Sequence, residues 1–260
     1  MPQPRVLVLR APGTNCDEET AHAWERAGAL AETRHISTIL DDPGALDAYQ
    51  VLTLPGGFSY GDDLGAGRIL ASRLGSVLGD TLRRFRDRDG LVLGICNGFQ
   101  VLVKAGLLPG LPEAMGPSTL TFNDSGHFES RWVRLIPTSG LSPFLVDDEP
   151  IELPVAHGEG KFVMAQPDAL ALLETSGQVV LRYADGDDQP STTYPANPNG
   201  SVGALAGLCD PSGRIFGLMP HPERYIDSIH HPQWTRRRLG FDRPGDGLRI
   251  FHNAVSALMN

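Results

Sequence analysis

A cysteine between two glycines is the residue of this chain best suited to do chemistry. Cys96 stands at the centre of residues 94–98, Gly-Ile-Cys-Asn-Gly, a cysteine version of the G-x-S-x-G turn that joins a strand to a helix. Such a turn exposes the central side chain, and small residues two before and two after it relieve crowding. It also places the thiol at a helix N-terminus, where the helix dipole favours the thiolate. The pattern predicts acyl transfer through Cys96.

A histidine with a nearby carboxylate could supply the base that such a thiol needs. His221 lies between Pro220 and Pro222, which exclude a helix and hold the segment extended. Glu223 could accept a hydrogen bond from one imidazole nitrogen and leave the other facing the thiol. A free cysteine on its own is more often a packing residue, but the three residues together predict a Cys-His-Glu triad.

Backbone N–H groups that could hold a developing oxyanion are predicted at two turns. Gly56 and Gly57 follow an apolar strand and allow the backbone to approach a bound carbonyl closely, although such glycines also occur in ordinary turns. One of their N–H groups, together with that of Asn97, predicts an oxyanion hole. Gln100 lies one helical turn after Cys96 and could contact a polar substrate, or be a surface glutamine.

The elements that must position these residues alternate between short apolar strands and helices. This alternation predicts an α/β fold with a mostly parallel central sheet and helices on both faces, in a single domain over residues 1–260. Strands are predicted over residues 5–10, 33–36, 51–54, 91–95, 132–136, 151–155, 179–183, 201–208 and 215–219. Helices are predicted over residues 15–28 with Asn15 as the cap, 64–85, 99–103 and 246–259. We expect the region from 109 to about 156 to form a small antiparallel extension of the same sheet.

Composition excludes several classes of protein. The 260 residues carry a net charge of −9, and the basic cluster at 236–238 is too short to indicate nucleic-acid binding. No apolar stretch approaches the roughly 20 residues that span a membrane, and no signal-peptide pattern is seen. Cys16, Cys96 and Cys209 are too widely spaced for a disulfide framework or a zinc-ligand pair. We therefore expect a cytoplasmic protein with no nucleic-acid or membrane partner.

The combined motifs resemble those of a known enzyme family. Residues 94–98 together with 221–223 are similar to the class I, or triad, glutamine amidotransferases, which implies a flavodoxin-like fold. Further segments resemble one branch of that family, the glutaminase subunits of phosphoribosylformylglycinamidine (FGAM) synthase in de novo purine biosynthesis. These segments are residues 12–17, 55–62, 157–160, 194–201 and 219–224.

The resemblance implies a role for each site residue. Cys96 would be the nucleophile, His221 its base and later acid, and Glu223 the group that orients the imidazole. The oxyanion positions would be Gly57 and Asn97, and the glutamine contacts would be Gln100 and Gly56. The implied reaction is hydrolysis of L-glutamine to glutamate and ammonia through a cysteine thioester.

The resemblance also implies partners. A PurL-like synthetase subunit would use the ammonia and ATP to convert formylglycinamide ribonucleotide to its amidine, and a small PurS-like subunit would bridge the complex. This chain has no G-x-x-x-x-G-K-[ST] phosphate loop, so no cofactor is expected on it, and ATP and Mg²⁺ are expected on the synthetase.

Some features stay without a role at this stage. The stretch from 225 to 245 is longer than in the shorter family members; we expect its His230 and His231 to lie in a surface loop and not to bind a metal. Other polar residues exceed what packing requires: Asn15, His127, Glu129, Arg131, His157, Glu159 and the loop 194–201. The alternatives to an amidotransferase subunit are a stand-alone cysteine amidase or peptidase on the same fold, and a non-catalytic binding module.

Overall fold

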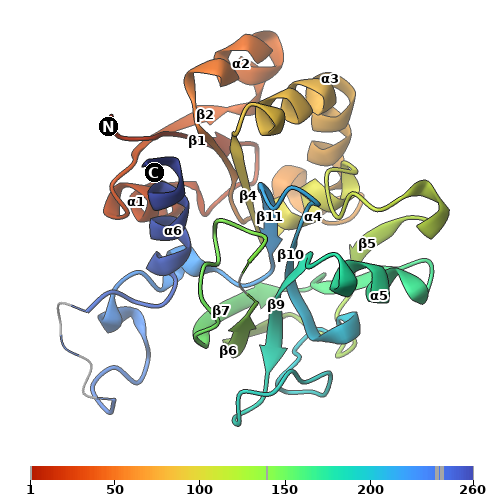
Figure 1. Cartoon of the computed structure of the whole chain (residues 1–260), viewed down its shortest axis with the longest axis vertical. Helices are drawn as coiled ribbons and strands as arrows, with labels where there is room; N and C mark the ends of the chain where they lie inside the picture. The colour runs from red at the N-terminus through yellow and green to blue at the C-terminus, as the bar shows by residue number, and fades with distance from the viewer. Residues whose placement is uncertain (1, 139, 238–239, 241–242, 260) are drawn as a thin grey trace.

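One large β-sheet forms the centre of the molecule (Figure 1). The computed structural model describes residues 2–138, 140–237, 240 and 243–259. Nine of the described strands form the sheet in the order β2-β1-β3-β4-β11-β10-β9-β6-β7. Five neighbouring strands run parallel: β2 (Leu30–His35), β1 (Arg5–Arg10), β3 (Val51–Leu54), β4 (Leu91–Ile95) and β11 (Ile215–Leu218). Four strands continue it antiparallel: β10 (Leu205–Cys209), β9 (Val179–Ala184), β6 (Glu129–Pro137) and β7 (Ile151–His157).

Helices cover the sheet on both sides. The α-helices of the described residues are α1 (Asp17–Arg26), α2 (Ile36–Asp41), α3 (Arg68–Asp87), α4 (Asn97–Lys104), α5 (Asp168–Thr175) and α6 (Leu248–Met259). The rings of Trp24 and Phe251 meet edge to face at 5.0 Å and join α1 to α6. In Figure 1 this pair of helices lies on one side of the sheet, and α3 and α4 lie on the other. The predicted α/β fold, with a parallel sheet and an antiparallel extension, is confirmed.

Several predicted element boundaries were wrong for local reasons. Helix α1 begins at Asp17, and Cys16 is the N-cap; Asn15 does not cap the helix but accepts a hydrogen bond from the Cys16 thiol. Helix α3 begins at Arg68 and not at residue 64, because Gly65 and Gly67 have φ values of +107° and +71°, outside the helical region. The sequence did not indicate α2, α5 or a separate two-stranded ladder of β5 (Ser118–Thr121) and β8 (Lys161–Met164).

The parallel strands decide where chemistry can occur. Strands β3 and β4 are buried along their whole length, as expected for parallel strands covered on both faces. Strands β3, β4 and β11 are neighbours and point the same way, so the segments that follow them meet at one edge of the sheet. The carboxyl edge of a parallel sheet is where α/β proteins bind ligands. Among the described helices, none has the length and apolarity that a membrane span requires.

Candidate active site

The turn that carries Cys96 has the predicted strand-to-helix geometry. Cys96 follows β4 and precedes α4 with φ 51° and ψ −103°, a conformation that costs free energy for a residue with a side chain. A Cβ atom on Gly98 would lie 1.9 Å from the carbonyl oxygen of Leu54, and one on Gly94 would lie 2.5 Å from Leu102. Only glycine fits at these two positions, which confirms the steric reason for the motif.

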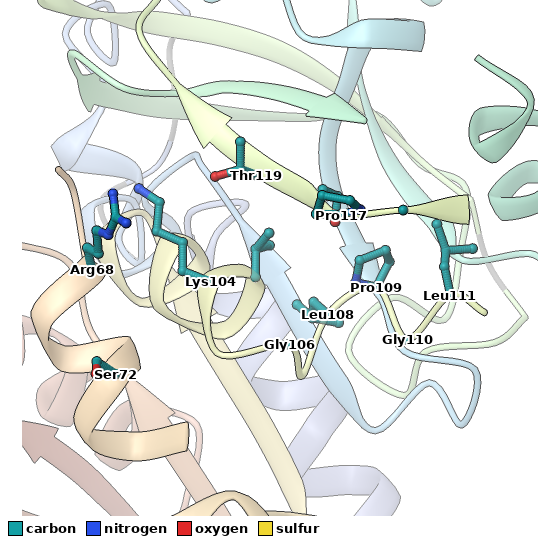
Figure 2. Close-up of a pocket in the computed structure, with 13 residues that line it drawn as sticks. Arg68, Ser72, Lys104, Gly106, Leu108, Pro109, Gly110, Leu111, Pro117 and Thr119 are labelled. Carbon is teal, nitrogen blue, oxygen red and sulfur yellow. The ribbon is translucent and has the colours of Figure 1, made fainter. Parts of the chain in front are cut away.

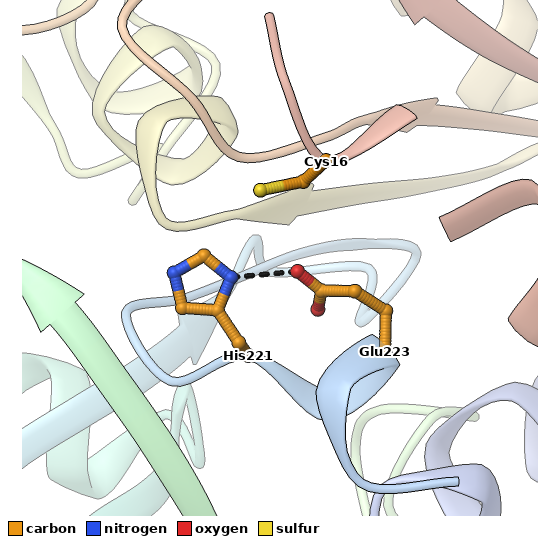
Figure 3. A group of neighbouring side chains, drawn as sticks. All are labelled: Cys16, His221 and Glu223. Carbon is orange, nitrogen blue, oxygen red and sulfur yellow. Dashed lines mark hydrogen bonds and ion pairs between the residues drawn. The ribbon is translucent and has the colours of Figure 1, made fainter. Parts of the chain in front are cut away.

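His221 and Glu223 approach this turn from the neighbouring strand. The Cys96 N–H donates to Leu218 O at 2.8 Å, so the end of β11 is bonded directly to the turn. The His221 N–H donates to Pro154 O at 2.8 Å, and its Nδ1 lies 2.6 Å from Glu223 Oε1 (Figure 3). Both side chains are almost fully buried, as is Cys96. The structure therefore brings together the three residues that the sequence singled out.

The charges around His221 favour its protonated form. Burial opposes the imidazolium, but the Glu223 carboxylate and the Cys96 sulfur favour it, and the pKa of His221 is held well above 6.5. Among the described residues, no hydrogen-bond partner satisfies the buried Nε2 of His221. Cys96 Sγ lies 3.7 Å from the carbonyl oxygen of Ala156. An imidazolium beside the sulfur stabilises a thiolate, which is the reactive form of cysteine.

Of the two candidate oxyanion positions, Gly57 lies in the loop after β3 and Asn97 begins α4, and hydrogen bonds tie this loop to the helix. Gly57 has φ +139° and bridges to Thr14. The Asn97 side chain accepts a hydrogen bond from the Ser59 N–H at 3.2 Å and donates to Asp62 at 3.1 Å. The loop after β3 is thus held against the first residue of α4. The arrangement can present backbone N–H groups to the oxygen of a carbonyl group whose carbon is attacked by Cys96.

The whole chain matches one family. A profile of the CobB/CobQ-like glutamine amidotransferase domain matches residues 3–256. The chain belongs to this family.

Relatives and solved structures agree with this assignment. The chain is 46% identical to the phosphoribosylformylglycinamidine synthase subunit PurQ of Dehalococcoides mccartyi, over 98% of each chain. It is 38% identical to human phosphoribosylformylglycinamidine synthase, where the match covers 97% of this chain and 20% of the human one. Its fold is similar to a chain of the PurLQS structure from Thermotoga maritima, with a TM-score of 0.74, 32% identity and complete coverage of both chains.

In this amidotransferase, Gln100 is committed to contacts within the protein. Its Nε2 donates to the carbonyl oxygen of Glu159 at 2.6 Å, and its Oε1 accepts from Asn97 at 2.9 Å. The Glu159 carboxylate in turn accepts from the Ala66 N–H at 3.2 Å and lies 3.8 Å from Lys104 Nζ. The structure gives Gln100 a place in a network beneath the site, and direct contact with glutamine stays a prediction.

Gly56 lies against the imidazole. A Cβ on Gly56 would come within 2.8 Å of His221 Cε1 and 3.1 Å of Cys16 Sγ. Any side chain at this position would push the ring or the thiol aside. The contact of Gly56 with glutamine stays a prediction. The space beside this glycine is filled by the imidazole of His221 and the thiol of Cys16.

His157 is a second buried histidine whose role the sequence did not indicate. Its Nδ1 lies 3.1 Å from Asn123 Oδ1, and no described group satisfies its Nε2. Burial and the charge of His221 lower the pKa of His157 to about 3. The ring is therefore neutral in the folded protein at neutral pH. The sequence around His157 could not reveal this neutral state, because the burial that lowers its pKa exists only in the folded protein.

This neutral histidine predicts acid-sensitive stability. The unfolded chain binds a proton at His157 below about pH 6.5 and the folded chain does not, so acid favours unfolding by about 1.4 kcal/mol per pH unit until the folded pKa is reached. When the pH falls from 6.5 to 5, the unfolding free energy of both proteins decreases. The decrease for His157→Gln is expected to be about 2 kcal/mol smaller than that for the parent chain. Urea unfolding at both pH values measures the two losses. Equal losses would contradict the assignment.

Other polar residues singled out from the sequence lie around the site in different ways. Glu129 is buried and pairs with Arg131 at 2.5 Å, and the Arg131 guanidinium stacks on Tyr194 with 4.7 Å between its central carbon and the ring centroid. His127 is exposed. In the loop 194–201, Asn199 and Ser201 are buried and bonded to each other, so this loop is held from inside.

The prediction of a surface loop was wrong for His231. His231 is buried, its ring lies 4.5 Å from that of Trp132, and its Nε2 lies 3.1 Å from the Glu152 carboxylate. Glu152 is distant in sequence, so no spacing could reveal this partner. His230 is exposed as predicted. Within the stretch 225–245 and the basic cluster, residues 238–239 and 241–242 lie outside the described residues.

A separate cavity lies between α3, the end of α4 and β5 (Figure 2). Its volume is about 730 Å³, and Arg68 and Lys104 line one end of it while Leu108 and Leu111 line the other. The Lys104 ammonium donates to Ala66 O at 2.5 Å, and burial lowers the pKa of Lys104. None of Cys96, His221 and Glu223 lines the cavity, so it is not where the triad acts.

Proposed function

We propose that this chain is the glutaminase subunit of FGAM synthase in purine biosynthesis. It hydrolyses glutamine and supplies ammonia to a synthetase subunit, in a complex that includes a small PurS-like subunit. The observation that carries the proposal is the buried arrangement of Cys96, His221 and Glu223 on a strand-to-helix elbow, in a chain similar to PurQ over 98% of its length. We place the enzyme in the cytoplasm, and we assign ATP and Mg²⁺ to the synthetase.

The geometry supports a two-step hydrolysis. The Cys96 thiolate attacks the side-chain carbonyl carbon of glutamine, and the N–H groups of Gly57 and Asn97 hold the resulting oxyanion. His221 Nε2 gives its proton to the departing nitrogen, so ammonia leaves and a glutamyl thioester remains. The now neutral imidazole takes a proton from water, whose oxygen attacks the thioester. Glutamate leaves and the thiolate–imidazolium pair is restored, with one glutamine and one water consumed for each glutamate and ammonia formed.

Glu223 determines which imidazole nitrogen of His221 transfers the proton. Its carboxylate accepts a hydrogen bond from Nδ1 at 2.6 Å, so the proton that moves is the one on Nε2. The same carboxylate stabilises the imidazolium that forms after the proton is taken up. Glu223 therefore both orients the imidazole of His221 and stabilises its protonated form.

An apolar rim at the carboxyl edge of the sheet supports docking to the synthetase. We define the rim as Phe58, Leu64, Phe122 and Phe128, whose side chains are 47%, 67%, 71% and 53% exposed. Phe58 follows the oxyanion residue Gly57, and Phe128 packs at 3.9 Å from a Cβ position on Gly158. Exposed large apolar side chains near one site are candidates for a protein interaction surface. Covering this rim would keep released ammonia from bulk water.

The experiment that tests the proposal is a glutaminase assay with and without partners. The purified chain is assayed alone and after addition of the PurL-like and PurS-like subunits, and we expect a large rise in glutamate formation on mixing. Leu64→Asp is expected to weaken binding of the synthetase by about tenfold or more, because it places a charge in the rim. Binding is measured by titration of labelled subunits.

The matched control lies at the opposite edge of the sheet. Leu30 is 53% exposed and is the first residue of β2, so Leu30→Asp adds the same charge at the amino edge. This variant should bind the synthetase as the parent chain does. Rapid hydrolysis of glutamine and other amides by the chain alone, unchanged by partners, would instead indicate a stand-alone amidase.

A further inference from the structure

A second cysteine, Cys16, lies beside the triad and is not used by the reaction. It is the N-cap of α1, at the end of the loop after β1, and its side chain is 1% exposed. Cys16 Sγ, one imidazole nitrogen of His221 and one carboxylate oxygen of Glu223 all lie within 4.8 Å of one another. In Figure 3 the thiol points toward the imidazole from the side opposite the loop that carries the ring.

The thiol is held in place from three directions. Arg224 Nη2 donates to Cys16 Sγ at 3.2 Å, and the thiol donates to Asn15 Oδ1 at 3.2 Å. The Cys16 N–H donates to Gly56 O at 3.4 Å, on the loop after β3. Arg224 Nε also donates to Glu19 on α1 at 2.9 Å, which joins the segment after His221 to the helix that Cys16 caps. The sulfur therefore cannot swing away from the ring.

Cys16 is neither a second nucleophile nor half of a metal site. Burial, with a further contribution from the Glu223 charge, raises the pKa of Cys16, so the thiol stays protonated and unreactive. The sulfur already accepts a hydrogen bond from the half-buried Arg224 guanidinium, and the positive charge of this group disfavours a metal cation at the same atoms. With these two roles excluded, the feature of Cys16 that can serve the site is its position against the imidazole of His221.

We propose that Cys16 is a positioning residue for the triad, whose thiol keeps the imidazole of His221 turned so that Nε2 faces Cys96. Glu223 holds the ring at one atom, Nδ1, and a single hydrogen bond leaves the ring free to tilt about that atom. Gly56 leaves room on this side of the ring, and Cys16 Sγ fills it at 3.1 Å from a Cβ position on that glycine. The thiol thus closes the side of the ring that Glu223 leaves open.

Three variants of the full complex test the inference, which rests on the proposed function. Cys16→Ala removes the contact, Cys16→Ser restores a small polar group, and Cys209→Ala is the matched control. Cys209 is also a fully buried cysteine, its sulfur lies 3.7 Å from Gln178 O, and it belongs to β10, outside the triad. The measurements are kcat and KM for glutamine, the pH profile of kcat, and thermal unfolding.

Cys16→Ala is expected to lower kcat by about tenfold with KM changed less than about twofold, because a misplaced base slows the chemical step more than it weakens binding. Burial lowers the pKa of His221, but the Glu223 charge and then the sulfurs of Cys96 and Cys16 raise it, so removal of the Cys16 sulfur should move the alkaline limb to lower pH in Cys16→Ala. His157 also faces this imidazole and is unchanged in all three variants. Cys16→Ser should recover most of kcat and of the alkaline limb.

The outcomes separate this inference from the proposed function. If Cys16→Ala keeps the parent kcat and pH profile, or if Cys209→Ala lowers kcat equally at equal loss of thermal stability, the positioning role is wrong while the glutaminase stands. If the parent complex itself hydrolyses no glutamine, the proposed function fails first.

Discussion

Cys96→Ala is expected to abolish glutamine hydrolysis while the complex still makes product from ammonia. The variant removes the sulfur that forms the thioester, and no other described nucleophile is placed on the elbow, so glutaminase activity should fall by at least about a thousandfold. Alanine is smaller than cysteine and keeps the turn, so the fold should be preserved. Glutamate formation measures the first step, and FGAM formation from ammonium chloride measures the second.

The two assays together make this prediction specific. A variant that lost both activities would indicate that the complex had not assembled, which analytical ultracentrifugation can check. Normal glutamine hydrolysis by Cys96→Ala would show that the triad assignment is wrong.

Glu223→Gln is expected to reduce kcat for glutamine by roughly a hundredfold or more with little change in KM. Glutamine has the same size but can donate to Nδ1, which favours the tautomer whose proton is on the wrong nitrogen. It also removes the carboxylate that raises the pKa of His221. The alkaline limb of the pH profile should therefore move to lower pH, since the imidazolium loses its proton sooner.

The control for Glu223→Gln is the neighbouring carboxylate on α1. Glu19→Gln removes a charge that pairs with Arg224 at 2.9 Å but does not touch His221. At every pH, the kcat of Glu19→Gln should stay within about twofold of the parent value. A profile for Glu223→Gln that matches the parent would exclude the orienting role.

Local sequence predicted the geometry of the elbow because that geometry depends on nearby residues. A Cβ at Gly94 would lie 2.8 Å from the carbonyl oxygen of Gly98, a clash within the strand-to-helix turn itself. The prolines around His221 likewise restrict the backbone without help from the rest of the fold. The start of α3 was less predictable, because the positive φ angles of Gly65 and Gly67 in the preceding loop place it.

Residues far apart in sequence were beyond such reasoning. His231 reads as one of two surface histidines, yet Glu152 and Trp132 bury it. Gln100 reads as a substrate contact or a surface residue, yet Glu159 and Asn97 engage its amide. Glu152, Trp132 and Glu159 come from other strands and loops, and no spacing rule connects them to these residues. Asn97 alone, three residues before Gln100 on α4, lies at a spacing that the sequence could have suggested.

The sequence by itself predicted the class of fold and singled out Cys96, His221 and Glu223, because sterics and periodicity act over a few residues. The tertiary structure decided that β4 and β11 are neighbours, which brings Cys96 and His221 to one edge of the sheet. It also decided that Cys16 lies against the imidazole and that His157 is neutral. Proximity across the sheet and loss of water on burial set these properties, and both exist only once the chain has folded.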